Sequence, residues 1–146
     1  MADLVSLTAA DLGEVMRIER LPGYDVFHAS FTADEHAAEF ASADAHYLGF
    51  RHDGGLAGFV ILQELRAPTV SLRRISVREP GQGIGAALFR AAVDWVFANT
   101  DAEAVKLHVR PENHRARHVY LREGFTPYRS DETGDLMSVT RARWSA

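Results

Sequence analysis

The stretch SVREPGQGIGAALF, residues 76–89, carries glycine at three alternate positions, Gly81, Gly83 and Gly85. It follows a segment with strand character and leads into an apolar run with helical spacing. Glycine allows positive φ and close approach of the backbone to another group, and the free amides at the start of a helix attract phosphate groups. The stretch therefore predicts a strand, an anion-holding loop and a helix that begins near Ile84.

Loops of other chemistry share parts of this pattern. Residues 81–86 fit the G-x-G-x-x-(G/A) pattern of dinucleotide-binding proteins, and Glu103 follows at a suitable distance. Against this, the segment TVSLRRISV at 69–77 has five polar residues in nine, whereas the first strand of a dinucleotide-binding fold is almost continuously apolar. A phosphate loop of the NTPase type would need Lys followed by Ser or Thr after the last glycine. Here two alanines follow Gly85, so this type of loop is excluded. Dinucleotide binding is disfavoured, and a turn without a ligand stays open.

Size and composition fit one globular domain covering residues 1–146, because 47% of the residues are hydrophobic and 25% are charged. Cysteine is absent, which excludes disulfides, thiolate metal sites and a cysteine-bound acyl intermediate. The net charge of −4 disfavours a nucleic-acid-binding surface. No apolar run is long enough for a membrane span, and the N-terminus lacks the order of a signal peptide, so we expect a cytoplasmic protein.

The remaining pattern alternates strands and helices and predicts an α/β domain. Before the glycine loop we expect a strand at 4–7, a helix capped by Thr8, a helix from Thr32 or Asp34 to Phe40, and a hairpin at 46–65. After it we expect a strand at 105–110, a helix from Asn113 to Gly124, and a hairpin at 127–139.

The strand at 69–77 changes its alternation midway. Val70 and Leu72 place apolar side chains at even positions, whereas Ile75 and Val77 place them at odd positions. A β-bulge at 73–74 would return all four side chains to one face. The alternative is that the two arginines there are solvated charges on a ragged edge.

The segment LHVRPENHRARHVYLREGF, residues 107–125, continues a strand, stops it at Pro111 and begins a helix at Asn113. Ala116, Val119 and Tyr120 share one face of that helix, and Gly124 ends it. From the pattern alone, Tyr120 is expected to be a core tyrosine whose hydroxyl finds a partner.

From about residue 47 to about residue 128 the sequence resembles the GNAT (GCN5-related) family of acyl-CoA-dependent N-acetyltransferases. Residues 80–85 look like the family's (R/Q)-x-x-G-x-(G/A) loop, with Pro80 in place of Arg or Gln. The family segment N-x-x-A-x-x-x-Y-x-x-x-G-F falls on Asn113, Ala116, Tyr120, Gly124 and Phe125. The resemblance implies a mixed, mostly antiparallel sheet flanked by helices, with a bulged and splayed central strand.

The resemblance also implies a site. The loop would hold the pyrophosphate of coenzyme A, and amides near 75–77 would bind the pantetheine arm and polarise the thioester carbonyl. Tyr120 would protonate the departing thiolate. Apart from the resemblance, Glu64 and His108 are the candidates for the base that takes the proton of the amine, and the alternative is that each is a solvated or hydrogen-bonded side chain without this role. Acetyl-CoA is the expected co-substrate, without a metal, and the expected coenzyme-binding residues are Ile75, Ser76, Val77, Gln82, Gly83, Ile84, Gly85, Ala86, Asn113 and Tyr120.

The expected partner is an amine, carried by a small molecule, a protein N-terminus or a lysine, with no nucleic acid or membrane; a homodimer stays open. The acceptor site would lie in residues 1–46 and the hairpin at 127–139. Its candidate charges are Glu19, Asp25, Asp34 and Glu35, unless they form solvated faces. Two other functions stay open. The chain could be a catalytically inactive regulatory domain that binds acyl-CoA, or a protein that binds a nicotinamide dinucleotide.

Overall fold

The computed structural model describes residues 3–22, 31–52 and 54–146. The strands of this part form one seven-stranded sheet in the order β1-β2-β3-β4-β5-β7-β6. Neighbouring strands are antiparallel except β4 and β5, which are parallel. The strands are β1 (Asp3–Ser6), β2 (Ala45–His52), β3 (Gly55–Gln63), β4 (Thr69–Val77), β5 (Ala104–Val109), β6 (Thr126–Asp131) and β7 (Gly134–Thr140). This mixed, mostly antiparallel sheet confirms the predicted fold class.

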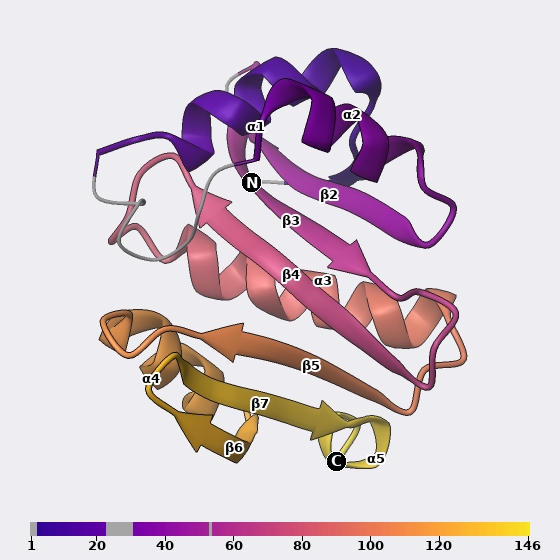
Figure 1. The fold of residues 1–146 in the computed structure, drawn as a ribbon, viewed down its shortest axis with the longest axis vertical. Coiled ribbons are helices and arrows are strands. Elements are labelled where there is room, and N and C mark those ends of the chain that lie inside the picture. Colours follow the sequence, from indigo (N-terminus) through magenta and orange to yellow (C-terminus); the bar gives the residue numbers. More distant parts are fainter. Residues whose placement is uncertain (1–2, 23–30, 53) are drawn as a thin grey trace.

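Helices cover both faces of the sheet (Figure 1). The helices are the 3-10 turn η1 (Ala9–Asp11), α1 (Leu12–Glu19), α2 (Ala33–Ala41), α3 (Ile84–Asn99), α4 (His114–Arg122) and α5 (Arg141–Trp144). Thr8 caps η1 rather than α1, so the first predicted helix is divided in two. The capping box predicted for α2 is present, because Glu35 N donates to Thr32 Oγ1 at 3.1 Å and Thr32 N donates to Glu35 Oε1 at 2.9 Å.

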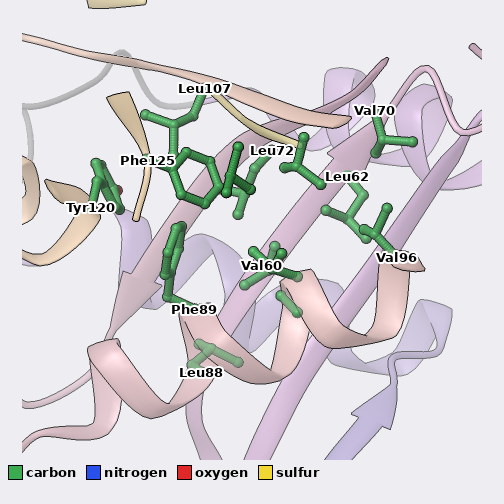
Figure 2. Packing of buried hydrophobic residues seen from close by; sticks show 14 of the residues in the cluster. Val60, Leu62, Val70, Leu72, Leu88, Phe89, Val96, Leu107, Tyr120 and Phe125 are labelled. Atoms are coloured by element: carbon green, nitrogen blue, oxygen red, sulfur yellow. The ribbon is translucent and has the colours of Figure 1, made fainter. Parts of the chain in front are cut away.

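Two apolar clusters fill the two sides of the sheet. The larger one joins α3 to the sheet and to α4, with Leu72, Leu88, Phe89, Leu107 and Phe125 among its members (Figure 2). The smaller one lies under α1 and includes Val15, Ile18, Tyr47, Phe59 and Ile61. Because both faces of the central strands are covered, β3 is apolar along nearly its whole length.

The predicted bulge lies in β4. Ile61 pairs with Arg74 while the next residue, Leu62, pairs with Leu72, so Arg73 is the extra residue. Leu72 belongs to the larger cluster, and Ile75 and Val77 pack against the same cluster. The bulge therefore returns the apolar side chains to one face, and the alternative of a ragged edge is wrong.

The predicted splay is also present. β4 pairs with β5 only over Thr69–Ser71, opposite Ala104–Lys106, although both strands continue beyond these residues. From there the strands diverge toward the glycine loop, and β5 pairs along its full length with β7 instead. The divergence opens the centre of the sheet at the carboxyl end of β4.

Candidate active site

A pocket of about 680 Å³ lies at this divergence. It is bounded by β4, the glycine loop and the start of α3 on one side, and by β5 and α4 on the other. Of the ten residues predicted to bind coenzyme A, all except Gln82 and Ile84 line the pocket, namely Ile75, Ser76, Val77, Gly83, Gly85, Ala86, Asn113 and Tyr120. The pocket therefore brings two distant segments of the sequence together.

The glycine loop has the backbone that its sequence predicts. Gly81 and Gly83 have φ values of 85° and 77°, in the left-handed region that favours glycine. Gly83 is the N-cap of α3, and the first helical hydrogen bond runs from Ala87 N to Gly83 O at 3.3 Å. The amides of residues 84–86 come before that bond and have no partner within the helix. Such amides suit a phosphate group, and Pro80 offers no side-chain donor beside them.

Tyr120 stands on α4 and reaches the pocket from the side opposite β4. Its side chain is buried, with its ring centroid 4.8 Å from that of Phe89 and 6.4 Å from that of Phe125 (Figure 2). Burial raises the pKa of the hydroxyl, so it stays protonated at neutral pH. Among the described residues, we find no hydrogen bond to this hydroxyl, in contrast to the partner expected for a core tyrosine. Asn113 caps the same helix by accepting from Ala116 N at 3.3 Å.

The two candidates for the general base lie in different places. His108 is exposed on β5 and lines the pocket. Its Nε2 lies 3.4 Å from Thr133 Oγ1, and that hydroxyl donates to Asp131 Oδ1 at 2.6 Å. Glu64 lies between β3 and β4, forms an ion pair with Lys106 Nζ at 3.2 Å, and is not part of the pocket lining.

The acidic residues suggested for the acceptor site also lie in different places. Asp34 and Glu35 are exposed on α2, and Asp25 lies outside the described residues. Glu19 is fully buried against Arg74 and His36, so it is not available to attract an amine. Sequence analysis missed this cluster, although the helical spacing of Glu19 from Val15 indicated a buried position.

In the part of the chain that the structure describes, no three His, Asp or Glu side chains gather closely enough to hold a metal ion. No helix there is both long and apolar enough to cross a membrane.

Known proteins share this fold and sequence pattern. The structure resembles that of PaiA N-acetyltransferase from Thermoplasma acidophilum bound to coenzyme A, with a TM-score of 0.80 and 19% identity over 96% of this chain and 99% of the other. It also resembles spermidine N-acetyltransferase from Vibrio cholerae bound to CoA and spermine, with a TM-score of 0.83 and 18% identity over 99% and 98% of the two chains.

The sequence comparisons agree with the fold. The chain is 30% identical over 122 residues to a putative [ribosomal protein bS18]-alanine N-acetyltransferase of Bacillus subtilis (strain 168), covering 77% of this chain and 78% of the relative. It is 33% identical over 92 residues to the 5-NmdU N-acetyltransferase of Pseudomonas phage PaMx11, covering 60% and 64%. Residues 12–125 match the acetyltransferase (GNAT) family. The chain therefore belongs to the GNAT family and is an acetyl-CoA-dependent N-acetyltransferase.

Proposed function

We propose that the protein transfers the acetyl group directly to a primary amine of a small molecule, a protein N-terminus or a lysine, with both substrates bound at once. Acetyl-CoA supplies a thioester: the amine nitrogen bonds to its carbonyl carbon, the C–S bond breaks, and the sulfur leaves as a thiolate. The observation that carries the proposal is that His108 and Tyr120 line one pocket from different elements, β5 and α4.

In this proposal the glycine loop and β4 hold the coenzyme. The amides of residues 84–86 bind the pyrophosphate, and the β4 residues 75–77 bind the pantetheine arm along the edge that diverges from β5. One of these strand amides polarises the thioester carbonyl as negative charge develops on its oxygen. Gln82 in the loop and Ile84 at the start of α3 do not line the pocket, and contact of each of the ten residues with the coenzyme stays a prediction.

Tyr120 is proposed as the donor to the departing sulfur. Its hydroxyl stays protonated because burial raises its pKa. The same shift makes it a weaker acid, so its contribution is expected at the lower end of the range for general acids, about 10²-fold.

His108 is proposed as the general base. An alkyl amine with a pKa near 10.4 is only about a thousandth deprotonated at pH 7, so a group that removes its proton accelerates attack. If His108 Nε2 donates to Thr133 Oγ1, then Nδ1 is left as the acceptor for the proton of the amine. Glu64 stays the alternative base, acting through water.

The named relatives act on three different amines, which are a ribosomal-protein alanine, 5-NmdU and spermidine. They support an amine acceptor without selecting one. The cytoplasmic location and the pairing of two chains also stay predictions, for cell fractionation and analytical ultracentrifugation to test.

A screen of amines for release of the coenzyme A thiol tests the function. It should include polyamines, aminomethyl nucleosides and peptides with an N-terminal alanine. We expect turnover with at least one class, whereas acetyl-CoA binding without turnover on any amine would favour the silent regulatory domain.

The variants His108→Gln and Glu64→Gln are then compared with the unaltered protein, using the amine that gives the highest turnover in the screen. We expect His108→Gln to lower kcat, while Glu64→Gln leaves kcat unchanged. The reverse result would assign the base to Glu64.

A further inference from the structure

Four polar side chains form a continuous buried network between α1, α2 and the sheet. Glu19 Oε2 lies 2.8 Å from Arg74 Nη1, and Glu19 Oε1 lies 2.6 Å from His36 Nε2. His36 Nδ1 lies 2.7 Å from the hydroxyl of Tyr47. The side chains of Glu19 and His36 are 0% exposed and that of Arg74 is 2% exposed.

The roles of the two His36 nitrogens depend on the tautomer of the ring, and a neutral ring protonated at Nε2 satisfies all three hydrogen bonds. Tyr47 donates to His36 Nδ1, His36 donates from Nε2 to Glu19, and Arg74 donates to the other oxygen of Glu19. Burial raises the pKa of the Glu19 carboxyl, but the hydrogen bonds from His36 and Arg74 and the positive charge of Arg74 outweigh this effect and hold the pKa below its ordinary value. The carboxylate and the guanidinium therefore balance each other in the interior.

The network ends at the bulge of β4. Arg74 directly follows the extra residue, Arg73, and is itself in register with Ile61 of β3. The Arg74 guanidinium also lies 4.5 Å from the ring centroid of Phe31, on the α1 and α2 side of the sheet. Ile75 points to the opposite side, against the larger apolar cluster. The network thus holds the side chain of Arg74, next to the extra residue, on the α1 and α2 side of the sheet.

The position of the bulge matters to the pocket. If the extra residue moved two positions toward the glycine loop, Arg74 would turn to the face of the larger apolar cluster and Ile75 would become the extra residue. Arg74 and Ile75 both line the pocket, so such a shift would change its wall. The buried ion pair between α1 and β4 opposes the shift, because moving Arg74 would leave the Glu19 carboxylate buried without its cation.

We propose that Glu19 is a positioning residue for acetyl-CoA: by holding Arg74 it fixes the bulge, and with it the β4 residues 75–77 against which the coenzyme binds. This inference rests on the proposed function, in which that part of β4 holds the pantetheine arm. Glu19 does not line the pocket, so it acts through Arg74 and not by contact with the substrate.

The variant Glu19→Gln tests the proposal, because it keeps the size of the side chain and removes its charge. Asp11→Asn is the matched control: Asp11 is also buried, it is paired with Arg51 at 2.8 Å, and neither residue lines the pocket. Both variants should lower the melting temperature. Only Glu19→Gln should raise the Kd and KM for acetyl-CoA, by about tenfold or more, and speed hydrogen exchange of the amides at 75–77.

The variant Tyr47→Phe covers the case in which Glu19→Gln does not fold. It removes only the hydroxyl at the far end of the network and should raise the Kd for acetyl-CoA by a smaller factor, about two- to fivefold. Calorimetry is done at a temperature where each protein is fully folded. If the folded variants bind acetyl-CoA and exchange amides 75–77 as Asp11→Asn does, the positioning role is wrong. Failure of the unaltered protein to bind acetyl-CoA would instead overturn the proposed function.

Discussion

Replacing Gly83 with alanine should separate the backbone strain of the glycine loop from its role in binding. Gly83 has a φ of 77°, and a Cβ built there meets no atom within 4 Å. Gly54, in the turn before β3, is a near duplicate with a φ of 78° and equally open surroundings. Gly83 lines the pocket and Gly54 does not. The two substitutions therefore impose the same strain, and only one of them places a methyl group where the coenzyme is expected.

The expected loss of stability and the expected loss of acetyl-CoA affinity can both be estimated. A left-handed conformation destabilises a residue with a Cβ by roughly 1–2 kcal/mol, which corresponds to a fall in melting temperature of about 2–8 °C for a chain of this size. Loss of one hydrogen bond from the loop to a charged phosphate would remove a further ~1.5–3 kcal/mol of binding energy. That loss equals a rise of roughly ten- to hundredfold in the Kd for acetyl-CoA.

Differential scanning fluorimetry measures the first effect, and isothermal titration calorimetry with acetyl-CoA measures the second. We expect both alanine variants to melt at similarly lowered temperatures and only Gly83→Ala to bind acetyl-CoA weakly. Equal acetyl-CoA affinity in the two variants would refute our assignment of the glycine loop as the phosphate site.

Four further substitutions have expected outcomes. Tyr120→Phe should leave the melting temperature nearly unchanged and lower kcat by about 10²-fold; full turnover at saturating substrates would contradict its role as donor. Gly134→Ala should unfold the protein or destabilise it by several kcal/mol, because its Cβ would lie 2.0 Å from the carbonyl oxygen of Val109. By contrast, a Cβ at Gly13 in α1 meets open space, so Gly13→Ala should stabilise the protein by about 0.5–1 kcal/mol. Burial lowers the pKa of His46, so the folded state resists protonation of this side chain. The free energy of unfolding should therefore fall as the pH drops below about 6.5. Thermal melts of His46→Gln between pH 7 and 5.5 should not show this loss of stability.

The features predicted well from the sequence are local ones. The bulge of β4, the start of α3 at Ile84 and the cap of α4 at Asn113 each follow from neighbouring residues. Backbone preferences and side-chain alternation determine these features over a few positions, so they need no knowledge of the tertiary packing. The residues expected to bind the coenzyme were named from the resemblance to the GNAT family, whose two motifs fall on these local features, and their contact with acetyl-CoA stays a prediction.

The buried network could not be predicted in the same way. Glu19 and Arg74 are 55 positions apart, and Glu19 and His36 are 17 apart, so no spacing rule connects them. The pair of arginines at the bulge was ambiguous for a related reason, since one is exposed and the other is buried. Only the packing of α1 against the sheet determines which one finds a carboxylate.

The splay between β4 and β5 also has a mechanical consequence. In the described part of the chain, the ladder that joins β1–β4 to β5–β7 has three residue pairs, Thr69–Ser71 with Ala104–Lys106. A coenzyme seated along the open part of β4 and against α4 would add a bridge between the two half-sheets beyond the short ladder. Acetyl-CoA at a hundred times its Kd should then raise the free energy of unfolding by about 2.7 kcal/mol, and residues 104–140 should resist proteolysis better when the enzyme is loaded. Bound acetyl-CoA would therefore stabilise the fold of the enzyme that consumes it, and this stabilisation would be lost when the coenzyme leaves.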